Sequence, residues 1–384
     1  MSNQQEIGTR IIKKLEEIRE SKVIVYFTGD REPYFKTQIG EDAVRPLYDH
    51  LLKLDFETEK KRIDLFLYSL GGDVSVPWRI VSMIREFCDE FNVLIPYRAH
   101  SGATLISLGA DHIIMGKKAE LSPIDPTLNI FEDPNKPPIT ISIEDINSFL
   151  SFAKKRLDIT EQNSKTQVLN LLVQDIGARM LGNVDRMNNH IRVVSEKLLI
   201  TRNEKITEDQ IKIIIDTLIE KMYFHGHAIG RKEAKEIGLP IEYPNQELED
   251  IIWELYLIYE KFLKLKEIIS PEILLNNKEE DNLTDIPMAL IESINKLHLF
   301  KTDFNIRKKR SVPQNPIVNV NLQLQLPPQI TPQQIPEHTQ QVLNELLNKV
   351  IQSIPNIVNK EIKKQSPVIG NEWKIFNKKW FEIR

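Results

Sequence analysis

Short apolar runs alternate with amphipathic stretches along the first part of the chain. Runs rich in β-branched and aromatic residues have the length and composition of buried strands, and they lie at 23–27, 63–68, 92–97 and 112–115. The spacing of apolar positions predicts helices before and between them, at 5–20, 41–54, 76–89 and 103–108. Apolar strands that alternate with helices are typical of a parallel sheet covered on both faces. The pattern therefore predicts the α/β fold class.

Longer helical patterns follow this alternation. They cover 143–157, 160–200 and 207–222, and a turn region rich in Gly and Pro follows at 225–244. An amphipathic helix is expected over 247–269. A second apolar stretch, ALIESINKLHLF, comes after it, and residues 246–310 are expected to be ordered.

The chain beyond residue 310 changes in composition and becomes rich in Pro, Gln and Asn. Residues 318–326 alternate strictly, as a half-buried strand does, whereas 327–336 contain four prolines and are expected to be a flexible linker. A helical pattern returns at 339–364. The closing stretch interleaves aromatic and basic residues, which are Trp373, Lys374, Phe376, Lys378, Lys379, Trp380 and Phe381. It either packs back on the body or forms an exposed tail that binds a partner.

Charge and cysteine content narrow the function classes. The net charge is −4, so nothing draws the chain to nucleic acid or anionic lipid. Cys88 is the only cysteine, which excludes an intrachain disulfide framework and a cysteine-based zinc site. The first residues lack the apolar core of a signal peptide, and no apolar run is long enough to span a membrane. We expect a soluble cytoplasmic protein without a cofactor.

Two turns of small residues each follow a predicted strand, and both could carry chemistry. One is Ser-Leu-Gly-Gly-Asp at 69–73 and the other is His-Ser-Gly-Ala-Thr at 100–104. Ligands bind at the carboxyl ends of parallel strands, where such turns lie. Ser101 could point its hydroxyl into a cleft, with the backbone amide of Gly102 beside it. The Gly-Gly pair of the other turn could bring a second amide close, and two such donors would form an oxyanion hole. The simpler interpretation is that Ser101 caps a helix and the glycines form ordinary turns.

A serine nucleophile needs a base, and the base needs an orienting group. Downstream candidates are Asp125 in Leu-Ser-Pro-Ile-Asp-Pro and two histidines, His225 and His227, in His-Gly-His. Each has a simpler interpretation, because Asp-Pro is a common turn former and two loop histidines are a weak metal signal. On these residues alone the alternatives stay open.

The order of these motifs resembles a known family. The segments that carry the likeness are IDLFLYSLGGDV, IPYRAHSGATLISLGADHIIMGKKAELSPIDP, ARMLGNVDRMNNHIRVVSEKLL and YFHGHAIGRKEAKEIGLPI, and together they span about residues 20–245. They are similar to the Clp-protease/crotonase superfamily and, more narrowly, to the serine dehydrogenase proteinase family, related to signal peptide peptidases. The resemblance implies a Clp/crotonase-like fold with a parallel sheet and ββα repeats, plus a C-terminal helical extension.

The resemblance also implies roles for the candidate residues. It implies a triad in the order Ser101, Asp125 and His225, with His227 as the alternative base two residues away, and oxyanion donors at the amides of Gly72 and Gly102. Signal-peptide-peptidase relatives use a Ser–Lys dyad, for which Lys165 is the candidate. Lys165 lies in a polar stretch, which argues against it, since a lysine base needs burial.

These inferences together define the expected protein. Residues 1–245 form a serine peptidase domain that acts on polypeptides through an acyl-enzyme, 246–310 a helical extension, and 311–384 a Pro/Gln-rich linker with a helical and aromatic tail. Relatives form rings or stacked trimers, which implies a homo-oligomer. Two other functions remain: a crotonase-like acyl-CoA enzyme, or a non-catalytic scaffold with the same fold.

Overall fold

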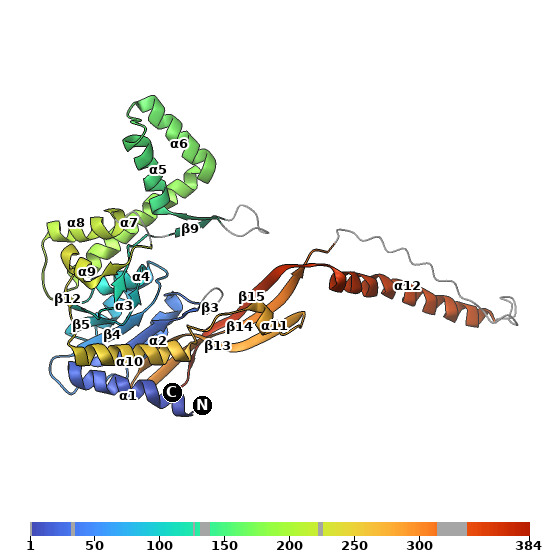
Figure 1. Cartoon of the computed structure of the whole chain (residues 1–384), viewed down its shortest axis with the longest axis horizontal. Coiled ribbons are helices and arrows are strands. Elements are labelled where there is room, and N and C mark those ends of the chain that lie inside the picture. Colours follow the sequence, from blue (N-terminus) through green and yellow to red (C-terminus); the bar gives the residue numbers. More distant parts are fainter. Residues whose placement is uncertain (1, 32–34, 126, 131–138, 222–225, 313–335) are drawn as a thin grey trace. The chain divides into compact units, whose positions relative to one another are not determined.

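An eight-stranded sheet organises the part of the chain that the computed structural model describes, which is residues 2–31, 35–125, 127–130, 139–221, 226–312 and 336–384 (Figure 1). The strand order is β12-β7-β5-β4-β1-β13-β14-β15. The first five are mutually parallel, namely β12 (Ile241–Glu242), β7 (His112–Met115), β5 (Glu90–Ile95), β4 (Arg62–Tyr68) and β1 (Lys22–Thr28). The predicted α/β class with a parallel sheet is therefore confirmed, and four of these strands follow the predicted apolar runs.

Both faces of the parallel sheet are buried, which explains why its strands are apolar at successive positions. Ile24 of β1 and Leu65 of β4 are fully buried in one core, while Val25 and Phe66, the next residues along, are fully buried in another. Burying each such side chain contributes about 2 kcal/mol to folding. Two separate cores thus hold the sheet between helical layers.

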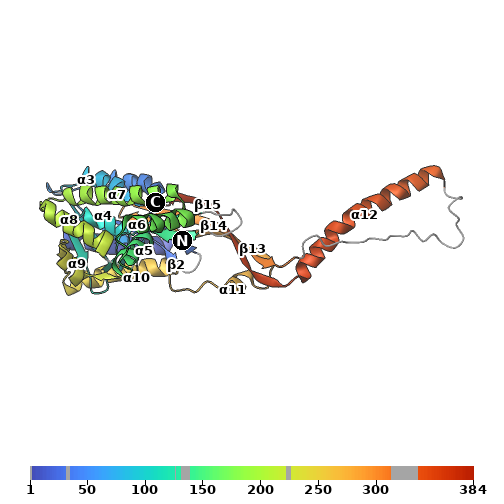
Figure 2. The ribbon, with the colours of Figure 1, turned by 90° about the horizontal axis from the view of Figure 1, so that it is seen from above.

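The helical layers come from different parts of the chain. Helices α1 (Ser2–Arg19) and α10 (Gln246–Phe262) lie side by side on one face (Figure 1). The other face is covered by α2 (Val44–Leu51), α3 (Val76–Arg85), α4 (Gly102–Leu108), α7 (Ala178–Ile200) and α8 (Glu208–Asp216). Figure 2 shows α3, α4, α7 and α8 grouped together. Because α10 supplies half of one layer, the body of the protein extends past residue 245.

Smaller elements complete this part of the chain. They are β2 (Asp30–Arg31), β3 (Phe35–Lys36), η1 (Glu41–Ala43), β6 (Arg98–Ala99), β8 (Glu120–Leu121), β9 (Thr127–Ile130), β10 (Ile139–Ser142), α5 (Ile143–Lys155), α6 (Gln162–Ile176), η2 (Thr217–Lys221), β11 (Ile229–Gly230) and α9 (Arg231–Ile237). The helical pattern expected over 160–200 is divided into α6 and α7 at Gly177, whose φ of 82° does not fit a right-handed helix.

The second half of the predicted helical extension is a β-hairpin. Helix α10 and the short α11 (Pro271–Leu275) are present, but Glu280–Ser293 and Lys296–Arg310 form β13 and β14. Strand β13 pairs antiparallel with β1, placing Leu290 opposite Phe27. The pairing covers an edge of β1 whose backbone groups would otherwise have no partner. A tertiary contact therefore decides the conformation of this stretch, and the helical prediction over it is wrong.

The described chain divides into two compact units. The first takes in the chain up to Ile269 together with Asp285–Thr302 and Asn377–Arg384, and the second consists of Ser270–Thr284 and Asp303–Phe376. Within the second unit, Arg310 pairs with Glu279 at 2.7 Å, and the ring of Trp373 meets that of Phe304 edge-on. These units do not follow the expected boundaries at 245 and 310, because the last residues of the chain return to the first unit.

The predictions for the C-terminal segments have different outcomes. The helix expected at 339–364 is present as α12 (Glu337–Gln365). The closing stretch is a strand, β15 (Val368–Glu382), which neighbours β14 in the sheet. Trp380 packs on the core of the first unit and its ring contacts Phe300, so the docked alternative holds for this end of the stretch. The strand expected at 318–326 and all but the last residue of the linker expected at 327–336 lie outside the described residues.

The described residues contain neither a candidate membrane-spanning helix nor a candidate metal cluster. No described helix combines the length and apolar character that crossing a membrane requires. Nor do three or more His, Cys, Asp or Glu side chains of the described residues form a group that could hold a metal ion.

Candidate active site

A small second sheet brings three candidate segments to one edge. Its strand order is β11-β8-β6. Strands β6 and β8 are parallel, with Ala99 opposite Leu121, and β11 is antiparallel to β8, with Ile229 also opposite Leu121. The chain therefore leaves β6 toward Ser101 and leaves β8 toward Asp125 at the same edge at which it enters β11 from His227. The segments next to Ser101, Asp125 and His227 are far apart in sequence, but this sheet brings them to one edge.

Ser101 has an unusual backbone conformation at the start of α4. Its φ is 49° and its ψ is −111°, whereas a helix-capping residue ordinarily has extended dihedral angles. Its side chain makes no capping hydrogen bond. Ser101 thus occupies the N-cap position of α4, and its carbonyl accepts a hydrogen bond of 3.0 Å from the amide of Leu105, but its hydroxyl does not cap the helix. A non-glycine residue at such angles is strained, and strained residues cluster at functional sites.

The Gly-Gly turn packs directly against Ser101. Gly71 has φ of 103°, and a Cβ placed there would lie 2.7 Å from the Cβ of Ser101. A Cβ at Gly72 would lie 2.2 Å from the carbonyl oxygen of Ile39. Neither position has room for a side chain, so both glycines are required for the close approach of the two turns.

The amides of Gly72 and Gly102 lie near each other. A Cβ built on Gly102 would be 3.3 Å from the amide nitrogen of Gly72. In the described part of the chain, neither amide donates a hydrogen bond to another group. Two neighbouring backbone donors beside a serine are the arrangement that stabilises negative charge on a carbonyl oxygen. They fit the oxyanion donors that the sequence indicates.

Asp125 is buried at the end of the segment that leaves β8. It is 8% exposed, and its Oδ1 accepts a hydrogen bond of 3.3 Å from the amide of Glu144 at the start of α5. Burial, together with the nearby charge of Asp125, raises the pKa of Glu144 above its ordinary value. The buried position is one from which a carboxylate can orient a histidine, as the third member of a triad does.

The candidate bases differ in placement. His225 lies outside the described residues. The side chain of His227 is 44% exposed, and its Nε2 lies 2.9 Å from Oε1 of Glu233. Lys165 is exposed on the first turn of α6, so it lacks the burial that would make a lysine a base near neutral pH.

Three buried hydroxyl groups at the site were not identified as functional from the sequence. Ser69 accepts hydrogen bonds from the Thr28 hydroxyl at 2.8 Å and from the Gly71 amide at 3.0 Å, and so holds the Gly-Gly turn. Ser122 accepts one from the amide of Ser101, and Thr104 donates to the carbonyl of Ala99. Ser69 and Ser122 stand inside the motifs that carry the resemblance, but the motifs do not reveal which groups they bond.

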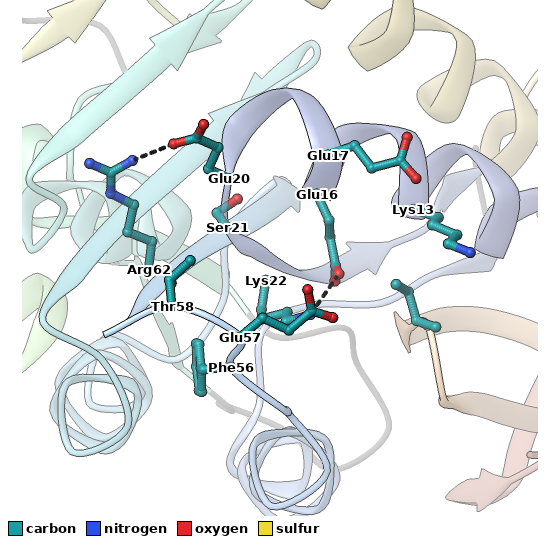
Figure 3. Close-up of a pocket in the computed structure, with 11 residues that line it drawn as sticks. Lys13, Glu16, Glu17, Glu20, Ser21, Lys22, Phe56, Glu57, Thr58 and Arg62 are labelled. Atoms are coloured by element: carbon teal, nitrogen blue, oxygen red, sulfur yellow. Dashed lines mark hydrogen bonds and ion pairs between the residues drawn. The ribbon is translucent and has the colours of Figure 1, made fainter. Parts of the chain in front are cut away.

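A charged pocket lies at the amino ends of strands in the large sheet and is not part of the candidate active site. It has a volume of about 450 Å³, and Figure 3 shows Glu16 of α1 and Glu20, the residue that follows this helix, among the residues that line it. Lys22 and Arg62, at the amino ends of β1 and β4, also line it, with Lys22 3.5 Å from Glu16 and Arg62 3.9 Å from Glu20. Burial raises the pKa of Glu16. Ser101, in contrast, follows the carboxyl end of β6.

A parallel α/β sheet with a strained serine beside two neighbouring amides, and a buried carboxylate at the same edge, is an arrangement found in serine hydrolases. Comparison with protein families narrows this class. The model of the ClpP-like SDH-type serine proteinases matches residues 1–281, and the chain belongs to this family. The resemblance inferred from the sequence motifs is thereby confirmed.

The individual proteins that are similar in sequence share less than 30% identity with this chain. Two uncharacterized proteins of Methanocaldococcus jannaschii are similar in sequence. One is 27% identical over 253 residues, covering 64% of this chain and 77% of its own length. The other is 23% identical over 256 residues, covering 65% of this chain and 75% of its own length.

Two solved structures are similar at low identity. A mutant of the 1510-N membrane-bound stomatin-specific protease has a TM-score of 0.36 at 14% identity, covering 61% of this chain and 85% of its own. ClpP1 from Listeria monocytogenes has a TM-score of 0.32 at 13% identity, covering 61% of this chain and 98% of its own.

Proposed function

We propose that this protein is an endopeptidase that hydrolyses peptide bonds through an acyl-enzyme on Ser101. The observation that carries the proposal is the juxtaposition of strained Ser101 with the amides of Gly72 and Gly102. No structural requirement of a helix start explains this geometry, because the Ser101 side chain does not cap α4. An acyl-transfer site requires a nucleophile and oxyanion donors in this relation.

The proposed reaction has two steps. In the first, Oγ of Ser101 attacks the peptide carbonyl carbon while the base removes the hydroxyl proton. The amides of Gly72 and Gly102 bind the oxyanion, and the base then gives the proton to the leaving amine. In the second, water attacks the ester at Ser101 while the base accepts a proton from this water. The base then gives this proton to Oγ of Ser101 as the ester bond breaks, which releases the carboxylic acid and free serine.

We assign His225 as the base and Asp125 as the group that orients it. Three observations support this assignment: the family order of motifs, the burial of Asp125, and the entry of the chain into β11 at the edge where Ser101 lies. His227 is less suited, since its Nε2 is engaged with Glu233 and its side chain is exposed. Lys165 is unsuited because it is exposed.

The proposed enzyme acts as a homo-oligomer. The resemblance to Clp relatives implies assembly, and apolar side chains on α5 and α6 support it. Phe152 is 51% exposed and Leu171 is 58% exposed. Large exposed apolar side chains on neighbouring elements are typical of interfaces.

The experiment that tests the function is hydrolysis of an unfolded protein such as casein by the wild type and by Ser101→Ala. We expect the variant to lose at least about 10³-fold in turnover while its melting temperature and oligomeric mass stay unchanged. Turnover by Ser101→Ala at the wild-type rate would overturn the proposal. Hydrolysis by neither protein would favour the scaffold alternative, and hydrolysis of an acyl-CoA alone would favour the crotonase alternative.

The assignment of the base has its own test. His225→Ala should lower turnover as much as Ser101→Ala, and the double variant should be little worse, because members of a triad act as a unit. His227→Ala is the matched control and should change turnover only slightly. The reverse ranking of the two histidines would move the base to His227, and indifference to both would point to a lysine base such as Lys165.

A further inference from the structure

The strain at Ser101 raises the question of what holds it. A residue at φ 49° and ψ −111° lies outside the conformations that L-residues favour, so its backbone is strained. Such a conformation persists only where the surroundings hold it in place. Since the Ser101 side chain forms no capping bond, we consider the groups that bond to the Ser101 backbone.

The amide of Ser101 is held by a side chain from another segment. It donates a hydrogen bond of 2.8 Å to Oγ of Ser122. Oγ of Ser122 in turn donates its own proton to the carbonyl of Pro123, also at 2.8 Å. This second bond fixes the rotation of the hydroxyl, so that a lone pair faces Ser101. Ser122 is 2% exposed, so water does not compete for the bond.

Ser122 is itself fixed from both sides. Its amide donates to Oγ1 of Thr104 on α4 at 3.2 Å. Two residues later, the amide of Ile124 donates to the carbonyl of Leu218 in η2 at 2.9 Å. The short segment from Ser122 to Asp125 therefore connects the turn of the nucleophile with the helical segment that precedes His225 in the chain.

We propose that Ser122 is a positioning residue that holds Ser101 in its reactive conformation, an inference that rests on the proposed function. Without the acceptor at Ser122, the amide of Ser101 loses its partner and the turn relaxes toward ordinary helix-start dihedral angles. The Ser101 hydroxyl then moves away from the line between the substrate carbonyl and the base. A misplacement of about 1 Å can lower the rate by about 100-fold.

Kinetic measurements on substitutions at residue 122 test this role. Ser122→Ala should lower kcat, and the rate of labelling by a fluorophosphonate, by about 10- to 100-fold, with KM little changed. Comparing Ser122→Thr with Ser122→Val separates the effect of losing the hydrogen-bond acceptor from the effect of a larger side chain. The two side chains have nearly the same size, and only Thr retains the hydroxyl. We expect Thr to react faster than Val.

A second buried hydroxyl in the same region provides the control. Ser107, fully buried on α4, donates to the carbonyl of Ala103 at 2.9 Å and makes no bond to Ser101. Ser107→Ala should leave kcat unchanged. The midpoint of the pH–rate profile should also stay unchanged in Ser122→Ala, since the base is intact. A shifted midpoint would assign Ser122 to proton transfer and overturn the positioning role.

Amide hydrogen exchange tests the contact without relying on activity. In the wild type and in Ser107→Ala, the peptide containing Ser101 should exchange slowly. Ser122→Ala and Ser122→Val should speed exchange at Ser101 by about tenfold or more, and Ser122→Thr should restore protection. Unchanged exchange in Ser122→Ala, or labelling at the wild-type rate, would overturn the inference. If the wild type shows no labelling that depends on Ser101 but the exchange pattern appears, the proposed function fails while the contact stands.

Discussion

Close backbone packing, rather than any single side chain, defines the candidate site at the scale of residues. The two turns approach so closely that Gly71 and Gly72 have no space for a Cβ. This packing places the amide of Gly72 beside that of Gly102 and Ser101. The site therefore depends on glycines for their lack of a side chain as much as on Ser101 for its hydroxyl.

A methyl group at residue 102 tests the oxyanion hole. Gly102 has no positive φ, so Ala fits its backbone, but the new Cβ would lie 3.3 Å from the amide nitrogen of Gly72. We expect Gly102→Ala to lower kcat by about tenfold or more, because the methyl group crowds the space that the substrate oxygen enters. The measurement is the steady-state rate alongside the melting temperature.

The matched control for this substitution is Gly182→Ala in α7. A Cβ there meets nothing within 4 Å, so activity should be unchanged, and stability should rise by a few tenths to 1 kcal/mol. Equal activity of Gly102→Ala and the wild type would contradict the assignment of Gly72 and Gly102 as oxyanion donors.

The sequence predicted part of this site and missed the rest for a physical reason. Ser101, Gly72 and Gly102 were predictable because small residues after apolar strands mark turns at the carboxyl edge of a sheet. The roles of Ser69 and Ser122 were not, because they depend on partners from other strands. The register of β1 and β4 brings Thr28 to Ser69, and the register of β6 and β8 brings the amide of Ser101 to Ser122. That register is a property of the folded sheet.

At the scale of elements, buried strands were predictable and the hairpin was not. Strand β7 lies at the predicted residues, and β4 begins one residue earlier than predicted. Both strands were predictable because their apolar runs are continuous. Strand β13 was missed because residues Met288 to Ser293 are all buried, so the alternation that signals a strand is lost there. Strand β14 also begins with a run of buried residues and alternates in burial only from Phe300 to Arg307. Their conformation depends on pairing with β1.

A buried pair of histidines links α2 to this hairpin. His50 of α2 is fully buried, with its Nδ1 2.7 Å from Oγ of Ser293 and its Nε2 3.1 Å from Nδ1 of His298. Burial is the main cause that lowers the pKa of His50 to about 3, and the positive charges of Lys296 and Arg384 add to it. The pKa of His298 is lowered too, mainly by burial.

This pair predicts a loss of stability in mild acid. Below pH 6.5 the unfolded chain binds a proton at His50 that the folded protein does not bind, so the free energy of unfolding decreases as the pH falls from about 7 toward 3. The loss from His50 is about 2 kcal/mol at pH 5. Urea denaturation at pH 7.5 and pH 5 measures it.

The control for this prediction is His50→Asn, which does not titrate. Its stability should be lower at pH 7.5, but it should depend less on pH than the wild type over the same range. An identical decrease in the two proteins between pH 7.5 and pH 5 would show that His50 is not the group responsible.

At the scale of the whole molecule, the chain order does not match the compact units. The first unit ends with Asn377–Arg384, and Leu297 exchanges backbone hydrogen bonds with Ile383 and Arg384. The expected boundary at 245 followed from the end of the family motifs, and the separate tail after 310 from the shift toward Pro and Gln, both of which are local information. The return of the terminus depends on long-range pairing of strands.

The exposed apolar residues of α5 and α6 predict self-association. Light scattering at micromolar concentration should give a mass that is a multiple of the chain mass. Phe152→Glu and Leu171→Glu should reduce the mass, since each places a charge in the proposed interface. Ile268→Glu is the control. Ile268 is 89% exposed and lies outside both helices, so this substitution should leave the mass unchanged. A monomeric mass for the wild type would contradict the prediction.

The most direct test of the central claim is to find where a serine-directed reagent attaches. The protein is incubated with a fluorophosphonate, and its intact mass and peptide map are compared with those of Ser101→Ala. The account predicts one adduct per chain, located on Ser101, with none in the variant and slower labelling in Ser122→Ala. A wild-type protein that stays unlabelled at Ser101, or a Ser101→Ala variant labelled to the same extent, would contradict the account.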